Sequence, residues 1–172
     1  EQDLPAYGFN RGFGHNVDLA VKNELLADLQ ENLIVSHAVG VDQPLATGVV
    51  RAAMLLRANS LARGYSGIRP ELVEALIALL NAGITPVVPS LGSVGASGDL
   101  APLSHIALAL IGMGQVEVGG ERLPAADALQ RAGLVPLRLA MKEGLALNNG
   151  VQVMNAIGLI ACARLQDLLR TA

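Results

Sequence analysis

The chain has 172 residues, about the length of one domain, and it is 52% hydrophobic but only 2% aromatic, which excludes a disordered chain. Twelve basic and 15 acidic residues give a formal net charge of −3, and no basic run is present, so we expect no nucleic-acid partner. The single cysteine, Cys162, excludes an internal disulfide and a cysteine-based metal site.

Apolar residues at helical spacing predict three helices in the first half of the chain, over residues 22–38, 49–63 and 70–83. Gly64 is expected to end the second helix, and Pro70 suits the first position of the third. All three are rich in Leu and Ala, so we expect them to pack against one another.

Residues 84–98 are rich in Gly, Pro and Ser and are not expected to form a regular helix. Asp99 then suits the N-cap of a further helix. Two consecutive glycines predict the turn of a small β-hairpin over residues 116–123. A short helix is predicted over 124–132 and a long one over 151–170.

These elements predict a mainly α fold in a single domain over residues 1–172, with one small β-hairpin. The uncharged stretches 75–98 and 144–163 approach the length of a membrane span, but the first contains two prolines and the second four side-chain amides. The first residues show neither the basic nor the apolar region of a signal peptide. We therefore expect a cytoplasmic protein with no membrane partner.

Residues 92–99, Gly-Ser-Val-Gly-Ala-Ser-Gly-Asp, place three glycines in seven residues before a predicted helix. Glycine permits positive φ and close backbone approach, and a helix N-terminus attracts anions. However, no Gly-Lys-Ser/Thr follows, which excludes a P-loop, and the spacing is not that of a dinucleotide-binding fingerprint. Composition alone therefore favours a structural connection between two helices.

Two other segments combine glycines or amides with reactive side chains. Aromatic residues alternate with glycines over 7–14, so this segment is either an aromatic-anchored surface loop or a mobile loop that delivers Tyr7 to a pocket. Residues 142–150 contain Asn148 and Asn149 in an apolar stretch, and these amides need partners if they are buried, unless they cap a helix end.

The three histidines show no metal-ligand spacing, so each is more commonly structural than catalytic. His15 is expected on a loop, and His37 on or near the apolar face of the first helix. Ser104 and His105 are sequence neighbours on a helix and therefore do not face each other as a catalytic pair.

Taken together, five segments closely resemble, in the same order, those of the ammonia-lyase family that uses a methylidene-imidazolone prosthetic group. They are residues 7–14, 36–37, 66–69, 92–102 and 142–150. The run Gly-Ser-Val-Gly-Ala-Ser-Gly-Asp-Leu-Ala-Pro-Leu is the most specific of them and favours a functional role for the glycine-rich loop. The resemblance implies that the chain is the N-terminal portion of an ammonia-lyase-like polypeptide, which forms a homotetramer with active sites shared between chains.

By this resemblance Ala96, Ser97 and Gly98 form the group 4-methylidene-imidazol-5-one (MIO), with no added metal or nucleotide. The Gly98 nitrogen attacks the Ala96 carbonyl with loss of water, and Ser97 then loses its hydroxyl as a second water. The resulting electrophile activates an aromatic amino acid, from which ammonia and a proton are eliminated to give an unsaturated acid.

The resemblance also implies roles outside the loop: Tyr7 in proton transfer, Asn149 in hydrogen bonding to the prosthetic group or substrate, and Gly14 and His37 in substrate binding. Histidine-specific relatives carry Ser-His where phenylalanine-specific ones carry an apolar pair. The imidazole of His37 therefore favours L-histidine, which gives urocanate, because another substrate leaves a buried polar group unpaired.

Two alternatives remain open at this point. An aromatic amino-acid 2,3-aminomutase uses the same electrophile but adds ammonia back, and a truncated non-catalytic relative only assembles. The family's usual threonines are replaced by Arg11 beside the tyrosine and by Val151 after Asn149-Gly150. The lost hydroxyl at Val151 favours the second alternative, whereas the intact Ala-Ser-Gly and Tyr7 oppose it.

Overall fold

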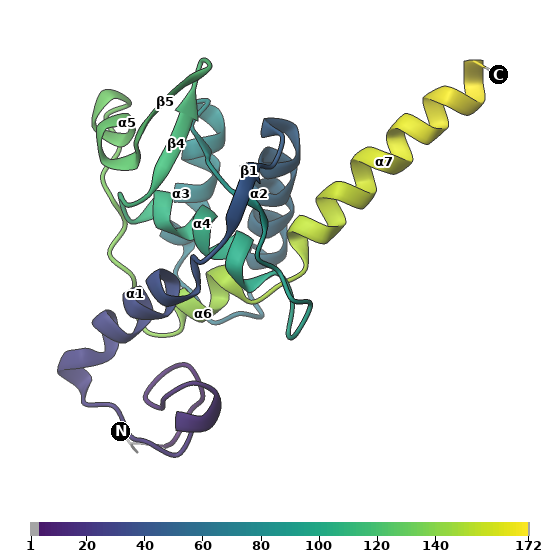
Figure 1. Ribbon diagram of the computed structural model, residues 1–172. Coiled ribbons are helices and arrows are strands. Elements are labelled where there is room, and N and C mark those ends of the chain that lie inside the picture. Colours follow the sequence, from purple (N-terminus) through teal and green to yellow (C-terminus); the bar gives the residue numbers. More distant parts are fainter. Residues whose placement is uncertain (1–3, 172) are drawn as a thin grey trace.

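The structure is a computed structural model that describes residues 4–171, and it consists mainly of helices, as predicted (Figure 1). The α-helices are α1 (Leu26–His37), α2 (Thr47–Leu61), α3 (Pro70–Asn81), α4 (Leu100–Leu110), α5 (Ala125–Arg131), α6 (Glu143–Asn148) and α7 (Gln152–Thr171). Two 3-10 turns, η1 (Gly14–Asn16) and η2 (Asn23–Leu25), precede α1. The second of these turns occupies the start of the predicted helix 22–38, so the α-helix itself begins later.

The hydrophobic core is one cluster of buried side chains, in which α3 packs against both α2 and α4 and to which α1, α5, α6 and α7 also contribute. Leu72, Leu76 and Leu79 lie at helical spacing and bury one face of α3. Helix α4 is apolar on almost every side, and eight of its 11 residues are buried, so it occupies the centre of the molecule. The glycine-rich loop that precedes α4 is therefore anchored at its C-terminal end to the centre of the core.

Short strands flank the helices: β1 (Val41–Pro44), β2 (Thr85–Pro86), β3 (Pro89–Leu91), β4 (Gln115–Val118) and β5 (Glu121–Pro124). The predicted hairpin is β4–β5, and its two turn glycines both have positive φ, as a tight hairpin turn requires. Two further antiparallel pairings, β2 with β4 and β1 with β3, were not predicted. These strands have two to four residues and are defined by partners far away in the sequence.

The N-cap predicted for Asp99 is wrong in one respect. Asp99 does precede α4, but its carboxylate makes no hydrogen bond to the first turn of that helix. It accepts hydrogen bonds from the Ser93 hydroxyl at 3.2 Å and from the backbone N–H of Met154 at 2.9 Å. The buried carboxylate therefore satisfies a free donor in the first turn of α7 and joins that helix to the glycine-rich loop.

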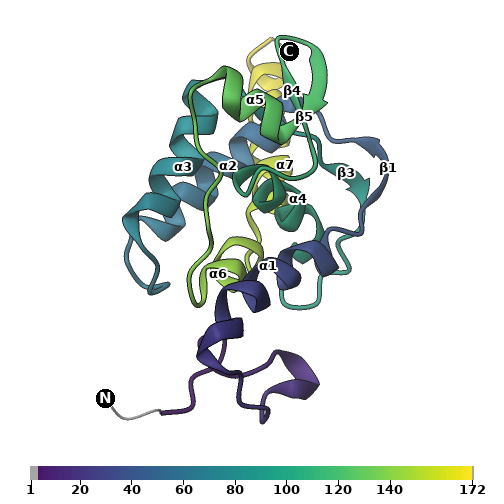
Figure 2. The same cartoon turned by 90° about the vertical axis from the view of Figure 1, so that its left-hand side faces the viewer.

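Two parts extend from the helical body: the N-terminal segment that precedes α1, and the C-terminal half of α7 (Figures 1 and 2). The stretch Glu143–Thr171 is long and apolar enough to cross a membrane by length and composition, which is weak evidence on its own. In the structure it consists of two helices, α6 and α7, separated by the turn at Asn149. Several large apolar side chains of α7 are exposed, among them Leu159, Leu168 and Leu169.

An ion pair holds the start of α6 against the start of α3. The Glu143 side chain is 1% exposed, and its oxygens accept from Arg69 Nε at 2.8 Å and Nη2 at 2.7 Å. The backbone N–H of Ala140 adds a third bond at 2.7 Å. Burial raises the pKa of Glu143, but these hydrogen bonds outweigh burial, so its pKa lies below the usual value.

His105 holds the backbone beside the glycine-rich loop. Its Nε2 accepts from the N–H of Gly40 at 3.1 Å, so in this bond Nε2 carries no proton. Gly40 in turn lies against Gly92, where an added Cβ would stand 3.0 Å from the Gly40 Cα. Burial lowers the pKa of His105 because the charged imidazolium is poorly solvated there.

We predict that Arg69→Met lowers the free energy of unfolding at neutral pH by roughly 3 kcal/mol, because it leaves the buried Glu143 carboxylate without a counter-charge. Glu143→Gln should cost less, since the half-exposed Arg69 can turn to solvent. Urea denaturation measures both variants. Equal losses in the two variants would contradict the buried-charge explanation.

We also predict that the unfolding free energy falls as the pH drops below about 6.5, the ordinary histidine pKa. A histidine whose pKa is depressed by folding stabilises the protein fully above its unfolded pKa and loses that contribution as the pH falls toward the folded pKa. Denaturation between pH 7 and pH 5 tests this, with His105→Gln as the comparison. The same slope in the variant would show that another group is responsible.

Candidate active site

The glycine-rich loop, residues 92–98, folds back on itself just before α4. Ser97 and Gly98 both have positive φ, +63° and +113°. The left-handed region is unfavourable for a serine, so the surrounding structure must hold it there. A side chain at position 98 would overlap the carbonyl oxygen of Gly150, which also accepts the N–H of Asp99 at 2.6 Å. Glycine is therefore required at this point of contact.

This contact places Ser97 and Asn149 on one cavity of about 480 Å³, which we call the serine cavity. Helix α6 lies within the segment 142–150, and Asn149 is its exposed C-cap residue. The walls combine polar and apolar groups, and the other lining residues are Arg57, Ser60, Tyr65, Ser66, Lys142, Leu145, Ala146, Gly150, Val151 and Gln152. Two of the predicted site residues are thus brought together.

Ala96, Gly98 and His37 line a second and more apolar space of about 300 Å³, the histidine cavity. The Nδ1 atom of His37 lies 2.8 Å from the carbonyl oxygen of Leu33 and 3.1 Å from the Ser36 hydroxyl. A carbonyl can only accept, so in the neutral imidazole Nδ1 carries the proton and Nε2 is free to accept a hydrogen bond. His37 and Asn149 therefore border the glycine-rich loop from two different cavities.

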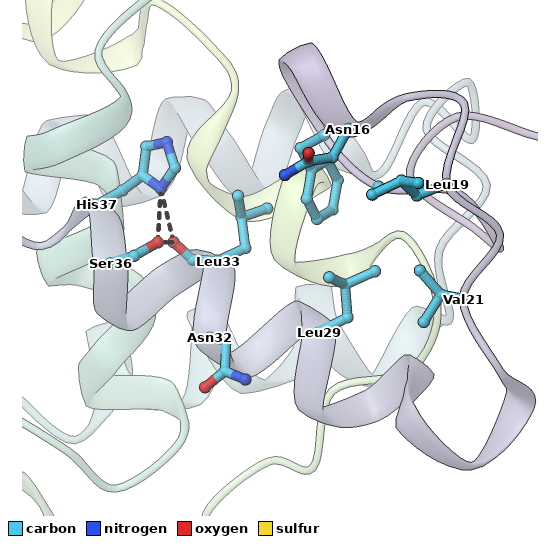
Figure 3. A pocket seen from close by; sticks show the side chains of 10 residues that line it. Asn16, Leu19, Val21, Leu29, Asn32, Leu33, Ser36 and His37 are labelled. Carbon is cyan, nitrogen blue, oxygen red and sulfur yellow. Dashed lines mark hydrogen bonds between the residues drawn. The ribbon is translucent and has the colours of Figure 1, made fainter.

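His37 also borders a third cavity of about 460 Å³ between α1 and the N-terminal segment (Figure 3). Figure 3 shows His37 at one end and the apolar side chains of Leu19, Val21 and Leu29 at the other. Two amides, Asn16 and Asn32, are part of the same wall. His37 therefore stands between this cavity and the histidine cavity.

Tyr7 and Gly14 meet each other but line none of these three cavities. The Tyr7 hydroxyl accepts the Gly14 N–H at 3.4 Å, and its ring packs edge-on against Phe13 with centroids 5.8 Å apart. Tyr7 remains 48% exposed. The guanidinium of Arg11, which the sequence placed beside this tyrosine, donates to the Asp18 carbonyl at 3.2 Å.

The two neighbouring amides of the segment 142–150 have different surroundings. Asn148 is buried and donates to the Ser104 hydroxyl at 3.3 Å, while its oxygen has no partner among the described residues. Asn149 is exposed to the serine cavity. Asn148 therefore belongs to the packing between α6 and α4, and Asn149 is the one available for chemistry.

Sequence reasoning gave no role to Arg57, which the structure places beside Asn149. Its side chain is buried, and burial lowers its pKa to about 10. The available signal was its spacing, because Val50, Met54, Arg57 and Leu61 follow one buried stripe of α2. A charged residue on such a stripe indicates a buried polar contact, here with α6 and the turn after it.

Known proteins resemble this chain in sequence and in fold. The family model for aromatic amino acid lyases matches residues 1–172. Histidine ammonia-lyase of Symbiobacterium thermophilum is 56% identical over 98% of this chain, which covers 33% of that protein. The structure of phenylalanine aminomutase from Pantoea agglomerans superposes with a TM-score of 0.91 at 39% identity, over 96% of this chain and 32% of that one.

Histidine ammonia-lyase from Trypanosoma cruzi superposes with a TM-score of 0.85 at 40% identity, over 93% of this chain and 31% of that one. The chain thus spans about a third of the length of the relatives it matches. The similarity extends over almost all of the chain, in sequence as in fold. The chain belongs to the aromatic amino acid lyase family.

Proposed function

We propose that this chain is the N-terminal portion of an ammonia-lyase that converts L-histidine to urocanate and ammonia, with MIO formed from Ala96, Ser97 and Gly98. The observation that carries the proposal is the contact of Gly98 with the Gly150 carbonyl, which sets the Ala-Ser-Gly sequence beside Asn149. Family membership and the curated histidine ammonia-lyases at 56% identity support the choice of reaction.

The residues of the loop suit the group they are proposed to form. Cyclisation requires the Gly98 nitrogen to approach the Ala96 carbonyl, and small side chains together with two successive positive φ angles favour such a fold-back. Residue 98 has no room for a Cβ. The helix α4 that follows directs its positive N-terminal end toward the loop. Once formed, the group supplies the electrophile that the ordinary side chains lack.

The remaining site residues bind and orient the substrate in this proposal. His37 offers Nε2 as an acceptor for the N–H of a substrate imidazole, and the histidine cavity that it lines is mainly apolar. Asn149 donates its side-chain amide from the serine cavity. Tyr7 moves the proton, and Gly14 borders the substrate.

Tyr7 and the glycine-rich loop lie in separate parts of this chain, so a complete site needs either movement of the N-terminal segment or a second chain. We propose the latter, in a cytoplasmic homotetramer with shared sites. Two thirds of the relatives' sequence lies outside the match, so residues beyond this chain also remain to contribute to the site. We also propose that residues 1–172 form a single domain.

A 2,3-aminomutase is the second candidate, because the phenylalanine aminomutase structure matches as closely as any lyase structure described above. The two activities differ in product, since a lyase releases the unsaturated acid and an aminomutase a β-amino acid. Product analysis by mass spectrometry after incubation with L-histidine separates them. Formation of β-histidine in place of urocanate would decide for the aminomutase.

We predict that the full natural polypeptide containing this chain has an intact mass lower by two water molecules than its sequence requires. Ser97→Ala should not show the loss of two waters and should lose turnover, because without the hydroxyl the second water cannot leave and no methylidene forms. Circular dichroism of the variant should match that of the parent protein, since Ser97 is exposed. An unmodified parent protein would contradict the proposed cofactor.

We also predict that His37→Leu lowers kcat/KM for L-histidine by roughly 10- to 100-fold while raising the relative rate with L-phenylalanine. One hydrogen bond to a substrate N–H is lost and an apolar wall is gained. Glu31→Gln, at an exposed position of the same helix, serves as the matched control. Unchanged selectivity in His37→Leu would exclude this residue from substrate recognition.

A further inference from the structure

We propose that Arg57 is a positioning residue of this site, which fixes Asn149 and Gly150 relative to Ser97 by binding the backbone at the end of α6. The inference rests on the proposed function, because it concerns the formation and use of the same loop. Arg57 does not reach the reacting atoms itself. It acts through the chain that carries Asn149.

The contacts of Arg57 are concentrated on one turn of the chain. Nη2 donates to the carbonyls of Ala146 and Asn149, the latter at 3.0 Å, and Nη1 donates to Oε1 of Gln152 at 3.1 Å. The residue is 5% exposed. Within residues 4–171 no carboxylate pairs with it. A buried guanidinium with only neutral acceptors is unusual, because its burial is compensated by carbonyl dipoles alone.

Those carbonyls need a partner because α6 has only six residues. The last four carbonyls of a helix have no intrahelical donor, and they carry the negative end of the helix dipole. A cation that donates two planar hydrogen bonds satisfies both requirements at once. Arg57 therefore helps to set the end of α6 and the direction in which the chain leaves toward Asn149.

Gly150 connects Arg57 to the glycine-rich loop, because it contacts both of them. A Cβ at position 150 would overlap both Nη1 of Arg57 and Oε1 of Gln152, so the guanidinium lies directly on the Gly150 backbone. On its other side, the Gly150 carbonyl accepts the Asp99 N–H and touches Gly98. Only three backbone bonds therefore separate the carbonyl carbon of Asn149, whose oxygen Arg57 binds, from the carbonyl carbon of Gly150, whose oxygen touches the loop.

The alternative is that Arg57 has only a structural role and stabilises the packing of α6 and α7 against α2. That role predicts a loss of stability without any change in loop cyclisation or in catalysis by the folded fraction. The positioning role predicts incomplete cyclisation and a lower kcat in folded protein, because a displacement of about 1 Å at a reacting group can cost about 100-fold.

The test compares Arg57→Met and Arg57→Lys in the full natural polypeptide, with Arg51→Met as the matched control. Arg51 lies on the same helix and donates at 3.1 Å to the carbonyl of Leu80, near the end of α3, but it does not line the serine cavity. Intact mass gives the fraction of chains that have lost two waters, circular dichroism and thermal melting report folding, and steady-state kinetics with L-histidine give kcat and KM.

We expect Arg57→Met to fold, to show a reduced cyclised fraction, and to lose about 100-fold in kcat per cyclised chain with little change in KM. Arg57→Lys, which can hold one carbonyl, should be intermediate, and Arg51→Met should keep full cyclisation and the parental kcat. Complete cyclisation with parental kcat in Arg57→Met overturns the proposal. If Arg57→Met does not fold, parental cyclisation and kcat in Arg57→Lys overturn it.

The outcome also separates this inference from the proposed function. An unmodified mass in the parent protein overturns both. A cyclised parent protein with urocanate as product supports the proposed function, and the Arg57 variants then decide the positioning role independently. Restoration of kcat in Arg57→Lys relative to Arg57→Met supports a role for the donated hydrogen bonds rather than for side-chain volume.

Discussion

The contact between the Gly150 carbonyl and the backbone of Gly98 and Asp99 is the constraint on which the site depends. It joins two segments about fifty residues apart in the sequence, and it is possible only because position 98 has no side chain. The adjacent Ser97 is held in a left-handed conformation that it would not choose on its own. The conformation of the glycine-rich loop thus depends on its contact with the turn between α6 and α7.

That turn is held by charges at both ends of a very short helix. Glu143 at the start of α6 binds Arg69, and the carbonyls at its end bind Arg57. A six-residue helix is not stable by itself, so its position is set by these tertiary contacts. Asp99 adds a third link from the loop to the first turn of α7. The site is therefore built by buried polar groups around an apolar core rather than by the core alone.

The rest of the proposed site is distributed over other elements. His37 reaches the loop from the end of α1, while Tyr7 and Gly14 lie in the N-terminal segment and contact each other. Gln30 links that segment to α6, since its side chain donates to the Gly8 carbonyl and accepts the Gly144 N–H. Large apolar side chains of α7 such as Leu159 and Leu168 remain exposed, and the chain covers only 33% of its Symbiobacterium relative.

The sequence by itself determined the long helices and the hairpin. Apolar residues at helical spacing located α1 and α2, Pro70 and Asp99 marked the starts of α3 and α4, and Gly119-Gly120 specified a turn by backbone conformation alone. The pattern around Ala96-Ser97-Gly98 indicated the family only together with four other segments in the same order, because the glycine-rich composition alone also suits a structural connection.

Only the tertiary structure decided which groups share a cavity and what each buried polar side chain binds. It assigned the Asp99 carboxylate to α7 instead of α4, made α6 a helix, and placed Arg57 against the carbonyls at its end. These arrangements depend on partners far away in the sequence, 55 residues for Asp99 and Met154 and 92 residues for Arg57 and Asn149. Local spacing carries no information on such pairs, because a hydrogen bond between distant segments exists only after the helices have packed.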